Sequence, residues 1–305
     1  MSPGALYDSF IYPPFSVLDA RARWWQERKR RWMALGLESH KGRKEDLLKG
    51  FAKAMATFDR MQGREHAPAG WMSKSIFDPV LTELCYAWFC PSGGRVLDPF
   101  AGGSVRGVVA ALMGRSYLGI DISQTQIEEN REQADALSLS PRPKWKVGDA
   151  VHLYKAGVRG AFDMILTCPP YGDLERYSNA PEDLSNMPYE LFLGGFRQAV
   201  QNAVARLTED RFAIFVVGDF RDGKGISRGF VADTIRACKD ANLQFYNDGV
   251  LVTATASLPL RVRGQFEASR KLGKTHQNVL VFVKGDPKRA TEAVGNVVAF
   301  QFPDP

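Results

Sequence analysis

The chain has 305 residues, of which 45% are hydrophobic and 24% are charged. This balance is typical of globular proteins and excludes the disordered and fibrous classes. A formal net charge of +6 favours a polyanionic partner but does not require one. No apolar run reaches the roughly 18 residues of a membrane-spanning helix, and the first residues lack the basic start and apolar stretch of a secretory signal. We therefore expect a cytoplasmic protein with no membrane partner.

The cysteines and histidines of the sequence give no indication of a metal site. Cys85, Cys90, Cys168 and Cys238 form no CxxC pair, and the four histidines are scattered along the chain. Four cysteines are also too few for a disulfide framework. We expect reduced thiols in the protein interior and no bound metal.

The N-terminal part of the chain differs from the rest. Residues 18–37 lack internal proline and predict a helix, a second helix is predicted near 45–61, and the polar segment 63–70 reads as a linker. Trp25 and Trp32 lie seven residues apart and therefore share one face of the first helix. The arginines around them fit two interpretations, solvated charges on a helix that packs its aromatic side chains, or contacts to phosphate groups.

Strands and helices alternate after this part, which predicts an α/β, doubly wound, mostly parallel sheet. The last two strands have no helix predicted between them, so we expect an antiparallel pair at the end. The predicted strands cover 95–97, 117–120, 145–147, 162–166, 212–217, 243–253 and 279–283, and the predicted helices cover 79–89, 105–113, 125–137, 189–207 and 229–241. We divide the chain into a helical N-terminal extension (1–72), an α/β domain (73–286) and a C-terminal tail (287–305).

Two motifs follow the first two strands of this domain. Residues 98–104 read Asp-Pro-Phe-Ala-Gly-Gly-Ser, and small residues let the backbone approach a ligand while the next helix supplies free N–H groups. The segment is neither a GxGxxG fingerprint nor a P-loop. Asp121 ends the next strand, where a carboxylate can accept hydrogen bonds from ribose hydroxyls. Either motif alone fits an ordinary turn or helix cap equally well.

A third motif, Thr-Cys-Pro-Pro-Tyr, occupies residues 167–171 after the fourth strand. Two prolines cannot continue a central strand, so the chain must leave the sheet there. Tyr171 then presents an aromatic ring at the rim, on which a planar ring could stack.

Taken together, these segments and the Gly-Asp-Ala at 148–150 resemble the amino-group DNA methyltransferases. Those enzymes use S-adenosylmethionine to methylate the exocyclic nitrogen of adenine or cytosine. The resemblance covers about 75–284, has the order of the family's gamma arrangement, and implies a seven-stranded Rossmann-like methyltransferase sheet with a catalytic domain over 73–286. The Pro-Pro-Phe-Ser-Val-Leu-Asp start and the stretch 270–278 are similar to a phage or prophage subgroup, which suggests modification of phage DNA against restriction.

The resemblance implies a cofactor site for S-adenosylmethionine. Phe100 and Gly102 would line the methionine end, Asp121 would hold the ribose, and Asp149 would meet the adenine amino group. The full set that we predict to contact the cofactor is Phe77, Asp78, Asp98, Phe100, Ala101, Gly102, Gly103, Asp121, Ile122, Asp149 and Ala150. Ser104 stands where the family usually has its last glycine, which leaves the geometry of this loop open.

The resemblance also implies a catalytic segment of Cys168, Pro169, Pro170 and Tyr171. The Pro169 carbonyl and the Cys168 side chain would accept the N–H groups of the target amine, and Tyr171 would stack on a flipped-out base. Cys168 stands where the family has Ser, Asn or Asp, and a thiol is a weaker hydrogen-bond partner. We therefore expect slower chemistry or more reliance on backbone carbonyls. The cysteine precedes the prolines, unlike the nucleophile of carbon-5 cytosine methyltransferases, so covalent catalysis is not expected.

Two basic segments are predicted at the same rim, which favours DNA as the partner. One follows the fifth strand over 220–229, and the other links the last two strands and contains a single acid, Glu267. No insertion is long enough for a large recognition domain, so we expect a short site or relaxed specificity, and the polar loop 173–186 could close over the base. The predicted DNA-binding residues are Arg221, Lys224, Arg261, Arg263, Arg270, Lys271 and Lys274.

Other functions remain open at this point. The same motif occurs in RNA amino-methyltransferases and, in a related form, in enzymes that methylate protein glutamine. A further alternative is a catalytically weak DNA-binding protein that keeps the fold. Cys168 is nearly isosteric with serine, and Ser-Pro-Pro-Tyr is commoner among cytosine enzymes, which favours N4-cytosine slightly over N6-adenine. The sequence indicates neither the recognition site nor the oligomeric state.

Overall fold

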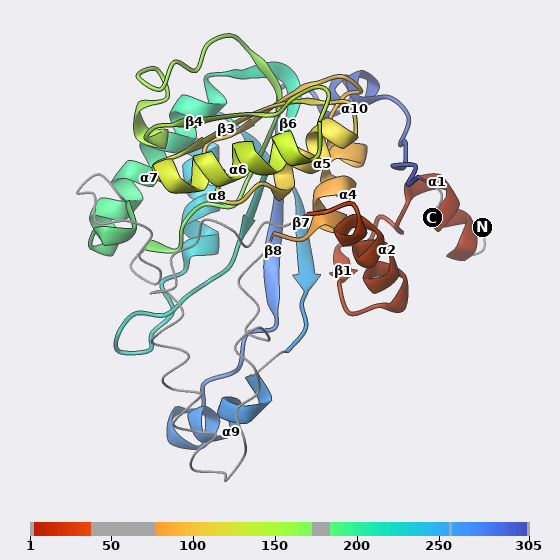
Figure 1. Ribbon diagram of the computed structural model, residues 1–305. Helices are drawn as coiled ribbons and strands as arrows, with labels where there is room; N and C mark the ends of the chain where they lie inside the picture. The colour runs from red at the N-terminus through yellow and green to blue at the C-terminus, as the bar shows by residue number, and fades with distance from the viewer. Residues whose placement is uncertain (1–2, 38–76, 173–183, 256–257, 304–305) are drawn as a thin grey trace.

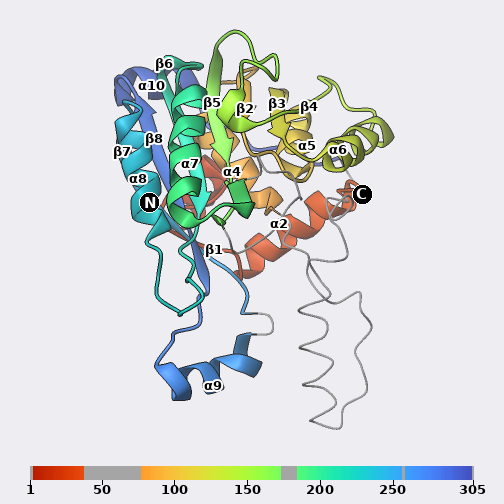
Figure 2. The same ribbon diagram turned by 90° about the vertical axis from the view of Figure 1, so that its left-hand side faces the viewer.

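The computed structural model describes residues 3–37, 77–172, 184–255 and 258–303. Its centre is an eight-stranded sheet with helices on both faces (Figures 1 and 2). The strands are β1 (Val17–Asp19), β2 (Arg95–Asp98), β3 (Ser116–Asp121), β4 (Lys144–Val147), β5 (Phe162–Thr167), β6 (Leu207–Val217), β7 (Gln244–Val252) and β8 (His276–Lys284). The helices are α1 (Pro3–Phe10), α2 (Arg23–Ala34), α4 (Pro79–Phe89), α5 (Val105–Leu112), α6 (Gln124–Ala136), α7 (Tyr189–Val204), α8 (Phe230–Asp240), α9 (Leu258–Ser269) and α10 (Pro287–Val294), with short 3-10 turns η2 (Ala150–His152) and η4 (Leu184–Asn186).

The strand order confirms the predicted fold class. The strands lie in the order β1-β7-β8-β6-β5-β2-β3-β4, and the crossovers between parallel strands carry helices. β8 pairs antiparallel with both β6 and β7, whereas the other neighbouring strands pair in parallel. The architecture is therefore a Rossmann-like α/β sheet with the expected antiparallel pair at the end of the chain.

The hydrophobic core has two layers, one on each face of the sheet. Side chains alternate along a strand, so each central strand supplies both layers. In β6, Phe212, Ile214 and Val216 pack in the layer that contains α2, α4 and α5. The intervening Ala213, Phe215 and Val217 pack in the layer that contains α7 and α8. Burial on both faces explains why the central strands read as nearly continuous apolar runs in the sequence.

The N-terminal extension differs from the prediction at its start. The helix predicted over 18–37 begins only at Arg23, because Val17–Asp19 forms β1, which pairs in parallel with β7 through Val17 and Val250. This eighth strand is too short to show an alternating pattern in the sequence. Trp25 and Trp32 are both fully buried, which supports the interpretation of α2 as a packed helix. The predicted helix 45–61 and linker 63–70 lie outside the described residues.

Three helices were not predicted, among them α1 near the N-terminal end, and two predicted boundaries were wrong. α9 lies within the link between the last two strands, and α10 follows β8. The carboxylate of Asp286 caps α10 by accepting from the N–H groups of Lys288 and Arg289 at 2.8 and 2.9 Å, and proline occupies the first turn. β6 begins at Leu207, five residues before the predicted start, and α7 accordingly ends at Val204 instead of 207. The division of the chain into three parts stays a prediction.

The direction of the strands fixes where a ligand can bind. All strands except β8 run the same way, so their carboxyl ends meet at one edge, which we call the carboxyl edge. β8 runs the opposite way and therefore starts at this edge. In Figures 1 and 2 α9 projects beyond the same edge, below the tip of β7. In the described part of the chain no helix is long and apolar enough to cross a membrane.

Candidate active site

The predicted cofactor and catalytic residues gather in the loops at the carboxyl edge. All of them except Phe77 and Asp78, which precede α4, end or follow β2, β3, β4 or β5, the strands on one side of the sheet. Ligands of doubly wound sheets bind in the crevice outside these strand ends. Most of the predicted residues are partly exposed there, and four are buried, namely Asp98, Ala101, Ala150 and Pro169.

Asp98 lies beneath the loop that follows β2. Its carboxylate is fully buried and accepts hydrogen bonds from Arg106 Nε at 2.5 Å, from the Tyr117 hydroxyl at 2.7 Å and from Thr167 Oγ1 at 2.7 Å. Since these donors come from α5, β3 and β5, Asp98 joins three neighbouring elements. Its position indicates that it supports the loop after β2, which is predicted to contact the cofactor, from below.

Arg106 is a residue of the site that the sequence analysis missed. It is 4% exposed, and its Nη2 donates to the carbonyls of Phe100 and Ala101 at 2.8 Å each. Its guanidinium also lies 4.4 Å from the ring centroid of Phe77. Burial opposes the charge, but the Asp98 carboxylate outweighs it, so the pKa of Arg106 lies above its ordinary value. The sequence did contain one indication of a buried role for Arg106, namely that it is the one charged residue in the otherwise apolar helix Val105–Leu112.

The loop conformation depends on Gly102 and Asp121. Gly102 has a φ of +50°, and its N–H donates to Asp121 Oδ2 at 2.8 Å. Asp121 Oδ1 accepts from the Ser123 N–H at 2.8 Å, and Asn130 Nδ2 donates to the Gly102 carbonyl at 2.7 Å. The loop and the Asp121 side chain therefore fix one another, half-buried at the edge.

Ser104 stands where the resembling family usually has a glycine, and here its side chain holds two helices together. Its side chain is buried, and its hydroxyl donates to the Gln133 side chain on α6. The serine thus attaches the start of α5 to α6. Gly103 and Ile122 are half-buried in the same two loops.

The next loop holds Asp149 in a defined orientation. Its Oδ1 accepts from the Val151 N–H at 2.8 Å and caps η2, and its Oδ2 lies 2.9 Å from His152 Nδ1. Ala150 is 5% exposed and packs below. Asp121 is the last residue of β3, and Asp149 follows the adjacent strand β4.

Asp78 is engaged in holding helices together. Its carboxylate caps α4 through the N–H groups of Val80 and Leu81, at 2.9 and 3.3 Å. It also accepts from Trp25 Nε1 at 3.2 Å and Lys29 Nζ at 2.9 Å. These contacts join α2 to α4, so the structure gives Asp78 a packing role. Its neighbour Phe77 reaches the cofactor loop through the Arg106 guanidinium.

The Cys168–Tyr171 segment, which is predicted to be catalytic, leaves β5 at the same edge. Cys168 and Pro170 are half-buried, and the ring of Tyr171 packs edge-on against Phe220 and Phe230, with centroids 6.1 and 6.4 Å apart. The Tyr171 hydroxyl accepts from Gln277 Nε2 at 2.9 Å. Gln277, on β8, is a second residue that the sequence analysis missed, because only the fold brings β8 beside this segment.

The other cysteines differ from Cys168 in burial. Burial raises the pKa of Cys85 to about 12 and that of Cys90 to about 11, and it holds the pKa of Cys238 well above its ordinary value. These three thiols are therefore protonated and inert near neutral pH. Within the described residues no group of three or more metal-binding side chains occurs.

The predicted DNA-binding residues separate into two groups. Near Tyr171, Lys274 Nζ donates to the Asp219 carbonyl at 3.2 Å, and Arg221 Nη1 donates to the Gly225 carbonyl at 2.9 Å. Lys271 lies against Gly225, where a Cβ would come 2.2 Å from its Nζ. Lys224 is exposed on the same loop. We call Arg221, Lys224, Lys271 and Lys274 the basic rim.

The remaining predicted residues belong to α9 and its end. Arg263 pairs with Glu267 at 2.9 Å on the exposed surface of α9. The Arg270 guanidinium lies 5.2 Å from the ring centroid of Phe266. The side chain of Arg261 lies outside the described residues. This second group is carried by the helix that projects from the carboxyl edge.

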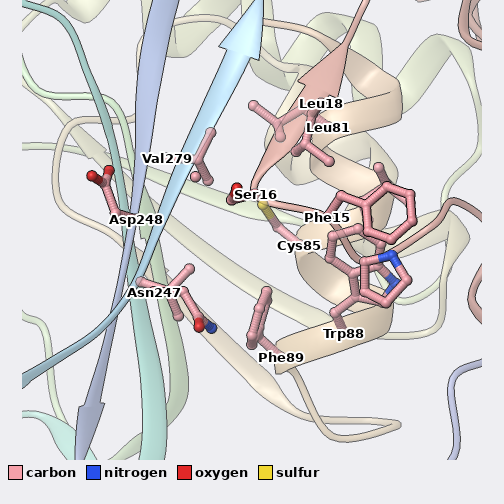
Figure 3. Close-up of a pocket in the computed structure, with 14 residues that line it drawn as sticks. Phe15, Ser16, Leu18, Leu81, Cys85, Trp88, Phe89, Asn247, Asp248 and Val279 are labelled. Atoms are coloured by element: carbon pink, nitrogen blue, oxygen red, sulfur yellow. The ribbon is translucent and has the colours of Figure 1, made fainter.

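A cavity of about 290 Å³ lies elsewhere, between α4, the β1 segment, β7 and β8 (Figure 3). Phe15, Trp88 and Phe89 line its apolar side, and Asn247 lies on the opposite strand. None of the residues predicted to contact cofactor, base or DNA lines it.

Comparisons with known proteins concern the fold. No model of a protein family matches the chain, and no curated protein matches it. Among solved structures it is similar to TrmN from Thermus thermophilus, with 19% identity, a TM-score of 0.47 and coverage of 68% of this chain and 49% of that one. The chain thus spans about half the length of TrmN.

Two further solved structures are similar over nearly their whole length and over about three quarters of this chain. A TehB-like SAM-dependent methyltransferase from Corynebacterium glutamicum has 18% identity and a TM-score of 0.40, over 77% of this chain and 97% of that one. Magnesium protoporphyrin IX methyltransferase from Synechocystis PCC 6803, solved with bound SAM, has 13% identity and a TM-score of 0.43, over 76% of this chain and 91% of that one. At these identities the similarity is one of fold alone.

Proposed function

We propose that this protein transfers a methyl group from S-adenosylmethionine to an exocyclic amino nitrogen of a flipped-out base in DNA. The observation that carries the proposal is that the predicted cofactor, catalytic and DNA-binding segments lie together at the carboxyl edge. The glycine loop, Asp121 and the Cys168–Tyr171 segment follow adjacent strands, and the basic rim adjoins Tyr171. Each motif alone is compatible with an ordinary turn, whereas their common location favours a single site.

The residues at the edge fit the proposed cofactor. A Cβ built on Gly102 would meet nothing within 4 Å, so open space lies above the loop. The half-buried Asp121 carboxylate is held beside this loop by the N–H groups of Gly102 and Ser123, and a carboxylate is an acceptor for the hydroxyls of a ribose diol. Asp121 would hold the ribose, Asp149 the adenine amino group and Phe100 the methionine end.

The chain's own contribution to the reaction is to position the amine. S-Adenosylmethionine, when bound, supplies a methyl group that its sulfonium already activates. An exocyclic amine is a weak nucleophile because its lone pair is conjugated with the ring. The Pro169 carbonyl and the Cys168 side chain would accept the two N–H groups and direct the lone pair, while Tyr171 would stack on the base.

The basic rim supports a nucleic acid as the substrate. Lys271 and Lys274 precede β8, Arg221 and Lys224 follow β6, and both segments adjoin the tyrosine of the catalytic segment. Lysine and arginine contacts to phosphate would hold the strand while the target base enters the site. A cytosine target is favoured slightly, because Cys168 is nearly isosteric with the serine of the cytosine enzymes. RNA is the second candidate, since phosphate contacts alone do not distinguish it from DNA.

The experiment is to incubate the protein with radiolabelled S-adenosylmethionine and, separately, duplex DNA of mixed sequence, total RNA and a protein extract. We expect label in the DNA, and much less with Tyr171→Ala. Cofactor binding is measured in parallel, and Asp121→Ala should weaken it. Label confined to RNA or protein would overturn the DNA assignment. Intact cofactor and DNA binding without transfer would indicate the inactive DNA-binding alternative.

A further inference from the structure

We propose that Gln277 is a positioning residue that fixes the Tyr171 ring for the target base. The inference rests on the proposed function, and it assigns a role to a residue that lies in the stretch 270–278 but outside the predicted cofactor-binding, catalytic and DNA-binding sets. Gln277 Nε2 donates to the Tyr171 hydroxyl at 2.9 Å, and both side chains are half-buried.

The topology explains how the two residues meet. Gln277 lies at the start of β8, where it pairs with Leu251 of β7. β8 is the reversed strand, so its first residues, and not its last, lie at the carboxyl edge. Tyr171 follows β5, and β6 lies between β5 and β8. The hydrogen bond therefore spans β6, just beyond its end.

The hydrogen bond completes a set of contacts around the ring. Phe220 and Phe230 meet Tyr171 at interplanar angles of 70° and 77°, which sets the tilt of the ring. Apolar edge contacts are weakly directional, whereas a hydrogen bond at the hydroxyl fixes the far end of the side chain. A ring held at both ends keeps its plane, which is what stacking on a base requires.

The same short segment carries two lysines of the basic rim. Lys274 precedes Gln277 by three residues and donates to the Asp219 carbonyl at 3.2 Å. A Cβ at Gly218 would lie 3.5 Å from Lys274 Nζ and 3.9 Å from Tyr171 Cε1, so lysine and tyrosine flank the same glycine. The segment thus sets the distance between a cation for the phosphate and the ring for the base.

A double-mutant cycle of Gln277→Leu and Tyr171→Phe tests the assignment. Each variant removes one partner of the hydrogen bond and keeps the ring. We expect each to lower kcat about 3- to 10-fold at saturating DNA and cofactor, the range that corresponds to one neutral hydrogen bond. The double variant should be no slower than the slower single variant. Gln244→Leu is the matched control, because Gln244 donates to a backbone carbonyl, that of Gly285, at the opposite end of the strands.

A second readout separates positioning from stability. A fluorescent analogue of the target base, placed at the site mapped with the unaltered protein, should report less ordered stacking with Gln277→Leu, while the melting temperature stays that of the control. An unchanged kcat in Gln277→Leu, or losses that multiply in the double variant, would overturn this inference and leave the proposed function standing. An unaltered protein that transfers no methyl group to DNA would overturn the proposed function, and with it this role of Gln277.

Discussion

Arg106 connects the interior of the site to its surface. Its guanidinium lies between the Asp98 carboxylate and the carbonyls of Phe100 and Ala101, with 4% of the residue exposed. These carbonyls belong to the loop that is predicted to contact the cofactor. A buried ion pair with this geometry adds little net stability, but loss of one partner leaves the other charge buried without compensation.

Replacement of Arg106 by methionine should therefore affect both stability and cofactor binding. We expect the free energy of unfolding to fall by about 3–5 kcal/mol because Asp98 stays buried, and the affinity for S-adenosylmethionine to fall because the loop loses its anchor. Urea unfolding and calorimetric titration measure the two effects. The matched control is Arg236→Met on α8, where the pair with Asp233 has a 62% exposed arginine, and the loss should stay below about 1 kcal/mol. Equal losses in the two variants would contradict the role of Arg106.

Cys168→Ser separates hydrogen bonding from covalent catalysis. A hydroxyl accepts and donates hydrogen bonds at least as well as a thiol, so kcat should stay within about tenfold of the original value, the worth of one hydrogen bond. A nucleophilic cysteine would instead lose nearly all activity on this replacement. The measurement is single-turnover methyl transfer. A DNA probe that traps the covalent cysteine–cytosine complex of carbon-5 methyltransferases should give no such complex with this protein. A loss of several orders of magnitude would contradict the proposed role.

Helix α2 shows how the N-terminal part joins the sheet domain. Glu83 on α4 is fully buried and accepts from Arg28 Nε at 2.7 Å, from Trp32 Nε1 at 2.8 Å and from the Phe300 N–H at 3.1 Å. Trp32 also stacks on Phe300 with ring centroids 4.5 Å apart. One carboxylate thus joins α2, α4 and the C-terminal residues.

Arg28→Leu should destabilise the whole protein. The Glu83 carboxylate would lose its cation in a buried environment, so we expect about 3–5 kcal/mol less unfolding free energy. Arg23→Leu on the same helix is the control, because Arg23 is 93% exposed and pairs with the exposed Glu27, a contact worth at most about 0.5 kcal/mol. Denaturant unfolding followed by tryptophan fluorescence measures both variants. Similar stabilities for the two would show that Glu83 does not anchor the helix.

Predictions from sequence succeeded for elements that local patterns determine. The central strands are buried on both faces, and their apolar runs between helices were visible, as with 162–166 and 212–217. β1 has three residues and exists only through pairing with β7, so no local pattern indicates it. The motif residues could be named from the sequence and their roles stay predictions, whereas the contacts of Arg106 and Gln277 arise only in the fold.

At the scale of the whole molecule, the basic side chains of the described residues serve different purposes in different places. On α2, Arg28 and Lys29 pair with Glu83 and Asp78, so these cations serve helix packing. The basic rim and α9 instead lie at the carboxyl edge, where the basic rim adjoins Tyr171. The net charge of +6 is therefore less informative than its location.

The basic rim should account for part of the salt dependence of DNA binding. Replacing both Lys271 and Lys274 by glutamine should reduce the slope of log affinity against log salt concentration by about 2, since each phosphate contact contributes about 0.9. Lys239→Gln with Lys288→Gln is the matched control, because these exposed lysines lie in the last turn of α8 and the first turn of α10, at the opposite edge. Fluorescence anisotropy at several salt concentrations gives the slopes. The same slope in both double variants would show that DNA does not contact the basic rim.

The most direct test of the central claim is the position of the transferred methyl group. Unmethylated duplex DNA would be incubated with the protein and S-adenosylmethionine, digested to nucleosides and analysed by mass spectrometry against N4-methylcytosine, N6-methyladenine and 5-methylcytosine standards. The proposed function predicts a methyl group on an exocyclic amino nitrogen, because the Pro169 carbonyl and the Cys168 side chain would accept the N–H groups of the amine and Tyr171 would stack on the base. A methyl group on carbon 5 of cytosine, or unmodified DNA despite bound cofactor, would contradict it.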